Sequence, residues 1–242
     1  QMYKQETHIP IVVTYHDSGV PNSDQCKSVC EAADYFVLHE PYDDLPSRGE
    51  YLRMGVQDWQ GYCQLNRSAP LWDRPVLGTV GFPFPWKCYD ELARVTAGCG
   101  WGLLLIAPTA SSTDTARWKA LNPQTIVFPE FLDRKEVVQW LAGCDATAFT
   151  YVTHNTGQSG AILQGIAARK PVIALSTCRQ FRTLYEEYPG SIYWIKDFAE
   201  LELRLKTMVL QRVDPRTVYI AEQESWTKVG KRYAEIYRSL LA

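Results

Sequence analysis

The sequence has neither an excess of charge nor a long run of apolar residues. Its 242 residues include 25 Lys and Arg against 27 Asp and Glu, a net charge of −2, and no basic stripe occurs. We therefore expect no nucleic-acid footprint, since that needs positive charge clustered on one face. The longest apolar runs, such as residues 101–108, are too short to span a bilayer and predict no transmembrane segment. No secretory signal pattern opens the chain.

Paired cysteine motifs are missing as well. The seven cysteines are odd in number and show no Cys-x-x-Cys spacing, which indicates reduced thiols and a cytoplasmic protein rather than a disulfide framework. Cys26 and Cys30 would share one face of a helix, but no histidine lies close to them in the sequence. We therefore expect structural cysteines at these positions and predict no metal site.

What the sequence does have is an alternation of strand and helix patterns from its beginning. Apolar runs at residues 11–14 and 35–38 predict strands, and the pattern at residues 23–33 predicts a helix between them. The following segment, residues 43–72, is irregular and polar and is expected to form a short helix and a linker. With 46% hydrophobic residues, the chain can bury one good core or two modest ones.

We place a domain boundary in this linker, which divides the chain into a partial domain at residues 1–68 and a second domain at residues 69–242. The second domain has strand patterns at residues 76–80, 102–107, 126–128, 146–149 and 171–175, and helical patterns at residues 89–97, 135–143 and 161–168. Strands that alternate with helices of ordinary length predict an α/β fold with a doubly wound parallel sheet, the Rossmann-like class. Ligands of such sheets bind beyond the carboxyl ends of the strands.

One stretch, residues 144–175, joins a strand, a polar loop, a helix and a second strand. Its loop is rich in Gly, Ser, Thr and Asn, and the helix is expected to begin at Ser159 and Gly160. Backbone N–H groups and the positive end of the helix dipole favour a phosphate at such a helix start. Every α/β domain has several loops of this kind and most bind nothing, so the pattern by itself also fits a plain turn.

The segment at residues 157–173 resembles the nucleotide-sugar segment of retaining glycosyltransferases with the GT-B fold, the group-1 or family-four-like enzymes related to glycogen and sucrose synthases. In that family, Glu-Gly-Phe-Gly opens a helix that runs into Glu-Ala-Met-Ala-x-Gly-x-Pro-Val-Ile. The tail at residues 224–241 is similar to the family's Phe-Ser-Trp ending, whose helix crosses back to the first domain. The two family glutamates fall on Thr156 and Gln164.

The resemblance implies donor-binding roles at several strand ends. Lys87 matches a family lysine that is aimed at the donor phosphates, while Phe82 replaces the family arginine. The segment after residue 127 lines the base pocket in the family, which makes Phe128 and Phe131 candidates for contacts to the base. The remaining donor-binding candidates come from the loop and the helix that follows it: Thr156, Gly157, Gln158, Ser159, Gly160 and Gln164.

The resemblance also implies a catalytic residue, His16, which follows the first strand pattern and matches a family Thr-x-His pattern facing the donor sugar. A histidine there can donate to a sugar hydroxyl or to a developing charge near neutral pH. Each candidate has a plainer interpretation. His16 can be a turn residue, a lone lysine is usually solvated, and aromatic residues at a strand end are usually core.

A member of this family would transfer a sugar from a UDP- or GDP-linked donor to a hydroxyl acceptor with retention of configuration, and without a metal or another cofactor. The sequence agrees, since no Asp-x-Asp motif follows a strand and fixed cations and amides can stabilise a departing phosphate. The alternative is a non-catalytic module that keeps the fold for nucleotide binding or assembly, which the two lost glutamates favour. An unrelated α/β protein is a third interpretation, but it does not predict the tail.

No Gly-rich loop precedes residue 69, although complete enzymes of this family begin with one. We expect either that the chain is a fragment without its N-terminal segment, or that it is naturally short and takes an acceptor surface from a second subunit.

Overall fold

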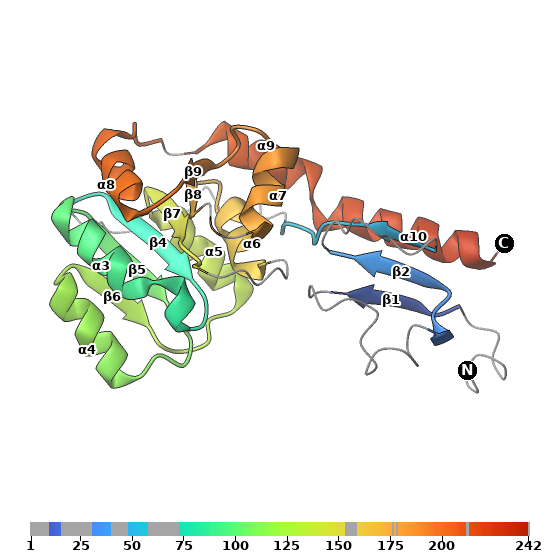
Figure 1. Ribbon diagram of the computed structural model, residues 1–242, viewed down its shortest axis with the longest axis horizontal. Coiled ribbons are helices and arrows are strands. Elements are labelled where there is room, and N and C mark those ends of the chain that lie inside the picture. Colours follow the sequence, from blue (N-terminus) through green and yellow to red (C-terminus); the bar gives the residue numbers. More distant parts are fainter. Residues whose placement is uncertain are drawn as a thin grey trace. The chain divides into compact units, whose positions relative to one another are not determined.

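The computed structural model describes residues 10–15, 31–39, 48–57, 73–152, 159–175, 177, 179–211 and 213–241, which form two compact units (Figure 1). The first unit combines β1–β3 with the C-terminal helix α10, and the second contains β4–β9 and the helices between them. The predicted domain boundary after residue 68 lies outside the described residues.

The first unit contains a three-stranded parallel sheet in the order β1-β2-β3. Its strands are β1 (Val12–Tyr15), β2 (Tyr35–Leu38) and β3 (Gly49–Tyr51). The first two confirm the strands predicted at residues 11–14 and 35–38 to within one residue. The helix predicted at residues 23–33 lies mostly outside the described residues.

Strand β3 corrects the prediction of a short helix and linker for its part of residues 43–72. It pairs with β2 in the register Phe36↔Gly49 to Leu38↔Tyr51, and no described strand pairs with its other edge. All three of its residues are only partly buried, so the strand has no buried apolar face. A three-residue edge strand containing Gly and Glu carries no alternating pattern, and its pairing with β2 is what holds it extended.

Helix α10 (Trp226–Leu241) belongs to the first unit and contacts its sheet. The predicted cap is confirmed, because the Ser225 hydroxyl accepts a hydrogen bond from the Lys228 N–H at 3.4 Å. Val229 and Ile236 are the buried residues of the predicted apolar stripe. The Tyr233 hydroxyl is 3.1 Å from the Thr14 hydroxyl in β1. The tail helix therefore packs against the first sheet, as the resemblance implied.

The second unit has a six-stranded sheet in which all neighbours are parallel. The strands are β4 (Val76–Val80), β5 (Gly102–Ile106), β6 (Thr125–Phe128), β7 (Ala146–Phe149), β8 (Val172–Leu175) and β9 (Tyr193–Ile195). The helices are α3 (Tyr89–Gly98), α4 (Ser112–Leu121), α5 (Arg134–Gly143), α6 (Gly160–Ala167), α7 (Arg179–Glu187), α8 (Phe198–Thr207) and α9 (Pro215–Gln223), with a 3-10 turn, η1, at Pro85–Lys87.

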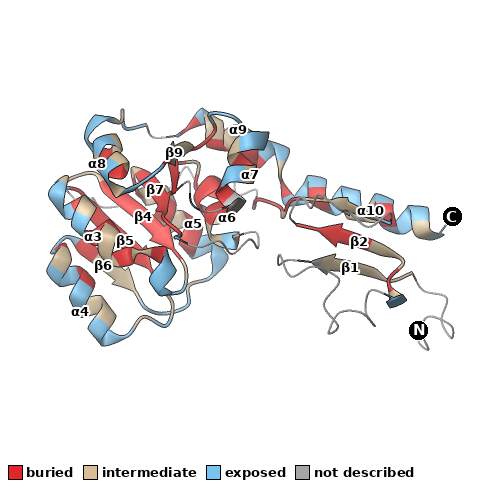
Figure 2. Cartoon of the chain, viewed as in Figure 1, coloured by how far each residue is buried: buried red, intermediate tan, exposed pale blue. Residues whose placement is uncertain are grey.

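The strand order β6-β5-β4-β7-β8-β9 corresponds to the 3-2-1-4-5-6 order of dinucleotide-binding Rossmann folds. Helices cover both faces, so the central strands are buried throughout and read as continuous apolar runs. Figure 2 shows β4, β5 and β7 as buried, with the helices exposed along their outer sides. The predicted doubly wound parallel sheet is confirmed.

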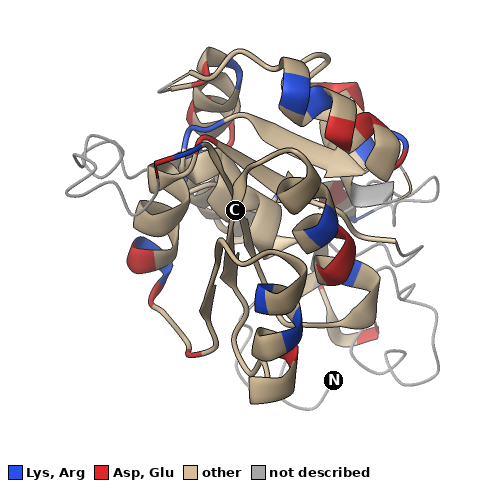
Figure 3. Cartoon of the chain, turned by 90° about the vertical axis from the view of Figure 1, so that its left-hand side faces the viewer, with Lys and Arg blue, Asp and Glu red and all other residues tan. Residues whose placement is uncertain are grey.

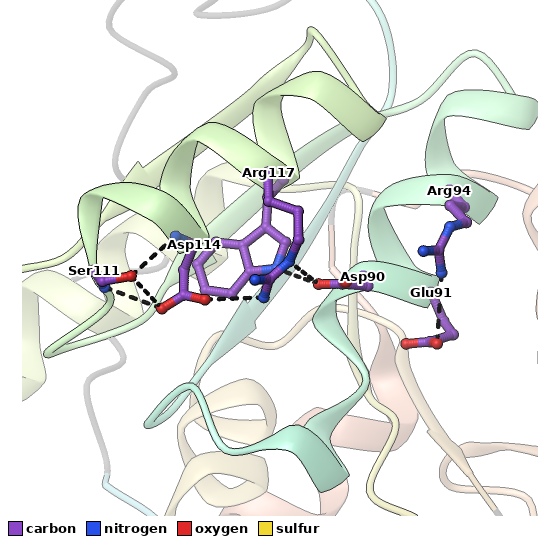
Figure 4. A network of polar contacts seen from close by, with 7 residues as sticks. Asp90, Glu91, Arg94, Ser111, Asp114 and Arg117 are labelled. Carbon is purple, nitrogen blue, oxygen red and sulfur yellow. Dashed lines mark hydrogen bonds and ion pairs between the residues drawn. The ribbon is translucent and has the colours of Figure 1, made fainter.

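Helix α4 was not anticipated, because it has almost no apolar stripe and buries only Trp118. Its start is fixed by a reciprocal cap in which the Ser111 hydroxyl accepts from the Asp114 N–H. Asp90 of α3 then accepts hydrogen bonds from Arg117 Nε at 3.0 Å and from Trp118 Nε1 at 2.8 Å (Figure 4). Polar contacts between α3 and α4 thus replace the apolar pattern that marks most helices.

Within the described ranges, none of the helices combines the length and the hydropathy required to span a bilayer.

Candidate functional site

The strand order of the six-stranded sheet reverses between β4 and β7, and the crevice beyond the carboxyl ends of such a strand pair is where α/β sheets bind ligands. Two hydrogen bonds tie together the segments that leave these strands. The Val152 N–H donates to the Trp86 carbonyl at 2.7 Å, and the Thr150 hydroxyl donates to the Lys87 carbonyl at 2.9 Å. The predicted phosphate ligand Lys87 therefore lies at the switch point.

The Lys87 side chain is an unusual cation. It is only 8% exposed, and its Nζ lies 4.8 Å from the centroid of the Tyr151 ring. Within the described part of the chain, no carboxylate forms an ion pair with it. Burial lowers the pKa of Lys87 to about 8, so the amine is still mostly protonated at neutral pH. A buried ammonium with an aromatic face but no counter-charge favours an anionic ligand.

Gly81, directly after β4, makes room for this ammonium group. A Cβ at this position would come within 1.9 Å of Lys87 Nζ, and the backbone has a φ of +138°, which L side chains rarely adopt. The Tyr89 hydroxyl donates to the Gly81 carbonyl at 2.9 Å and fixes the turn. Gly81 and Tyr151 are the site residues that sequence reasoning missed. Their only signal was their place, directly after β4 and two residues after β7.

Helix α6 begins at Gly160, as predicted, and the first backbone N–H groups of a helix have no partner within the helix itself. Ser159 precedes it. The loop candidates Thr156, Gly157 and Gln158 lie outside the described residues.

Gln164, one turn into α6, has a partly buried side chain. Its Oε1 is buried and has no hydrogen-bond partner in the part of the chain that the structure describes. A buried amide oxygen without a partner is uncommon in a folded protein, because most buried polar atoms are hydrogen-bonded.

Four aromatic side chains near η1 form what we call the aromatic shelf: Phe82, Phe84, Trp86 and Phe131. Each is between 41% and 69% exposed. Phe84 stacks on Trp86 with ring centroids 4.4 Å apart, and Phe82 contacts both Phe84 and Phe131 at 5.9 and 5.8 Å. The shelf joins the loop after β4 to the loop after β6. Phe82, which stands where the family has an arginine, is thus part of an apolar surface.

The two predicted base contacts occupy different surroundings. Phe131 belongs to the exposed aromatic shelf, whereas the Phe128 ring packs against Trp140 of α5 with centroids 4.6 Å apart. Contacts of either residue to a base stay predictions. His16, the predicted catalytic residue, directly follows β1 in the sequence and lies outside the described residues.

Basic and acidic residues are interspersed along the helices (Figure 3). Considering only the residues with described positions, no group of three His, Cys, Asp or Glu side chains is arranged to hold a metal ion.

Several solved structures share this fold. The chain matches sucrose-phosphate synthase from Thermosynechococcus elongatus with a TM-score of 0.69 and 16% identity, over 99% of this chain and 70% of that one. It matches an α,α-trehalose-phosphate synthase (UDP-forming) from Burkholderia xenovorans, solved with glucose-6-phosphate, with a TM-score of 0.74 and 10% identity, over 100% and 70% of the two chains. It also matches Anabaena HepE in complex with UDP-glucose, with a TM-score of 0.73 and 16% identity, over 98% and 74%.

No protein-family model matches the sequence, and no curated protein matches it either. The structural matches extend over nearly the whole chain, and the proteins matched are GT-B glycosyltransferases. The chain therefore has the GT-B fold, with a Rossmann-like second unit and a smaller parallel sheet in the first.

Proposed function

We propose that this protein is a glycosyltransferase that moves a sugar from a nucleotide-diphosphate donor to a hydroxyl acceptor. The observation that carries the proposal is Lys87, a buried ammonium without a carboxylate partner among the described residues, at the switch point of a Rossmann-like sheet. A diphosphate would supply the missing negative charge. The fold itself supports the proposal only through its neighbours, because one fold can host many activities.

In this proposal the Lys87 ammonium and the N–H groups at the start of α6 hold the donor diphosphate. As the bond between sugar and phosphate breaks, negative charge builds on the departing diphosphate, and a fixed cation in a site of low water content stabilises it. The reaction would proceed with retention and without a metal ion. Gln164 would pair its amide oxygen with a ribose hydroxyl, and His16 would face the transferred sugar.

The comparisons favour a UDP-linked hexose as the donor. One neighbour is in complex with UDP-glucose, and another is a UDP-forming synthase. At 10–16% identity these proteins supply the choice of probe, and the base is tested by comparing UDP with GDP.

A second candidate is a module that binds a nucleotide but transfers nothing. Thr156 and Gln164 at the positions of the two family glutamates favour it, because neither carries the negative charge that the family places there. The two candidates share the nucleotide site and differ in sugar release.

Calorimetric titration tests the shared site. We expect UDP to bind more tightly than GDP, and Lys87→Ala to weaken UDP binding about tenfold or more, since it removes a charge-assisted contact of about 1.5–3 kcal/mol. Lys119→Ala is the matched control, because Lys119 is an exposed lysine of α4 and should leave affinity unchanged. If neither nucleotide binds, the donor site is wrong.

Sugar release separates the candidates. Incubation with UDP-glucose should release glucose slowly in water if the protein is a transferase, and Lys87→Ala should suppress that release. Tight UDP binding with no release from any UDP-sugar would favour the non-catalytic module.

A further inference from the structure

The backbone of Lys87 accepts a hydrogen bond from a distant part of the chain. Thr150 directly follows β7 and is only 1% exposed. Its hydroxyl donates to the Lys87 carbonyl at 2.9 Å, although the two residues are 63 positions apart in the sequence. Threonine hydroxyls commonly bond to backbone groups close to them in the sequence. The Thr150 hydroxyl instead connects the end of β7 to the turn that carries Lys87.

The turn that carries Lys87 has little regular structure of its own. It is the three-residue 3-10 turn η1, in which the Lys87 N–H donates to the Phe84 carbonyl at 2.9 Å. Cys88, the next residue, has a φ of +56°, which is uncommon for a residue other than glycine. Such a conformation persists where surrounding contacts impose it. The position of Lys87 therefore depends on contacts from outside the turn.

Three contacts from outside the turn come from one short segment, residues 150–152. Thr150 binds the Lys87 carbonyl, and the Val152 N–H donates to the neighbouring Trp86 carbonyl at 2.7 Å. Between them in the sequence, Tyr151 places its ring centroid 4.8 Å from Lys87 Nζ. The segment thus contacts Lys87 both at its backbone and at its charged group.

Fixing the backbone matters for a lysine, because its side chain is a flexible four-carbon stem. If the Lys87 backbone shifts, the ammonium group leaves the Tyr151 ring and the space beside Gly81, where an added Cβ would come within 1.9 Å of Nζ. Misplacing a positioned group by about 1 Å can cost about 10²-fold in rate. The bond to the Lys87 carbonyl therefore affects where the positive charge lies.

We infer that Thr150 is a positioning residue, which sets the place of the Lys87 ammonium group through the Lys87 backbone. Thr150 is too buried to touch a ligand and acts only through Lys87. That this placement serves a donor diphosphate rests on the proposed function, whereas the effect of Thr150 on the ammonium group does not. One readout without nucleotide and one with UDP separate these two statements.

NMR of the full chain without nucleotide tests the placement of Lys87. In protein containing isotope-labelled lysine, the Lys87 ε-methylene signal is the one that Lys87→Met removes. The Tyr151 ring should shift that signal upfield, since Nζ lies over the ring. Thr150→Val keeps the shape of the side chain and removes the hydroxyl, so the signal should move toward those of exposed lysines. Thr150→Ser keeps the hydroxyl and should keep the upfield shift.

Two further variants exclude a general disturbance of the fold. Thr147→Val is the matched control, because Thr147 is a fully buried residue of β7 whose hydroxyl donates to the Pro171 carbonyl at 3.5 Å. It should leave the Lys87 signal unchanged. Thr150→Ala removes the same hydroxyl as Thr150→Val without placing a methyl group against the Lys87 carbonyl. It should also shift the signal, and it replaces Thr150→Val if the larger side chain prevents folding.

Calorimetric titration with UDP tests the consequence for the donor site. Thr150→Val should weaken UDP binding about three- to tenfold, the range expected for one hydrogen bond. In a Lys87→Met background the same substitution should cost less than about twofold, because its effect passes through the ammonium group. Thr150→Ser should bind UDP about as tightly as wild type. A merely structural role would weaken binding equally in both backgrounds.

The inference is overturned if the Lys87 signal is the same in wild type, Thr150→Val and Thr150→Ala. It is also overturned if Thr150→Val weakens UDP binding by the same factor with and without Lys87. If wild type binds no UDP, the proposed donor site is wrong, and the NMR comparison alone decides whether Thr150 positions Lys87.

Discussion

At the scale of single residues, the central feature is an ammonium group whose burial opposes its own charge. Lys87 is mostly enclosed, and its pKa falls to about 8 because of desolvation. The Tyr151 ring offers partial compensation. Without a ligand, the folded protein is less stable with this buried ammonium than it would be with an apolar side chain at the same position. Binding of an anion offsets that loss of folding stability.

The first prediction follows from that conflict. Lys87→Met should raise the free energy of unfolding at pH 7 by about 1–3 kcal/mol, since a pKa lowered by burial corresponds to about 1.4 kcal/mol per unit and the lost cation–π contact offsets part of the gain. The same variant should lose UDP affinity. Denaturant unfolding of both proteins measures the difference.

The sign of its pH dependence follows from proton linkage. The unfolded chain holds the Lys87 proton up to about pH 10.5, whereas the folded chain releases it near pH 8. Wild-type stability therefore gains from Lys87 as the pH rises between these values, and the advantage of Lys87→Met should shrink over that window. If Lys87→Met is less stable than wild type at pH 7, burial of the Lys87 charge does not destabilise the folded protein.

A second prediction concerns binding. Because the empty site loses its proton near pH 8, UDP affinity should fall about tenfold between pH 7 and pH 9, as the protonated fraction falls from about nine-tenths to one-tenth. Titrations across this range should show the decrease in wild type and a flat profile in Lys87→Met. An equally steep decrease in the variant would assign the titration to another group.

At the scale of the elements, α9 depends on a single buried carboxylate. Asp214 caps the helix by accepting from the Arg216 N–H at 2.9 Å and also pairs with the Arg216 guanidinium, an interaction that raises the pKa of Arg216. Asp197 caps α8 in a similar way, accepting from the Glu200 N–H at 2.8 Å, but is exposed. The two caps thus differ in burial and in the extra ion pair.

The third prediction compares these two caps. Asp197→Ala should cost about 1 kcal/mol, the value of a cap alone. Asp214→Ala should cost about 2–4 kcal/mol, because it also leaves Arg216 without its partner in a partly buried place. Thermal or denaturant unfolding measures both, and equal losses would mean that the ion pair adds nothing.

The same scale shows what sequence can and cannot predict. The strands β4, β5 and β7 were predicted because burial on both faces requires uninterrupted apolar residues. Strand β3 and helix α4 were not, since one depends on pairing with β2 and the other on polar contacts to Asp90. At the site, Lys87 was predicted because it matches a lysine of the family that the sequence resembles. Tyr151 contributes the face of its ring, and Gly81 contributes the space left by its missing side chain. Neither contribution produces a recognisable pattern in a sequence.

At the scale of the whole molecule, the chain forms two units, and the first of them is built from both ends of the sequence. It leaves the first unit after β3, builds the six-stranded sheet, and returns through α10, whose Arg232 pairs with Glu50 of β3. The resemblance of the tail to the family ending predicted this return. The GT-B neighbours extend over the same two units, and the account assigns donor binding to the second of them.

A crystal structure of the protein with UDP tests the central claim most directly. The account predicts diphosphate oxygens about 2.7–2.9 Å from Lys87 Nζ, near the start of α6, with Gly81 leaving space for the ammonium group. A diphosphate bound elsewhere, with Lys87 still facing only the Tyr151 ring, would contradict it.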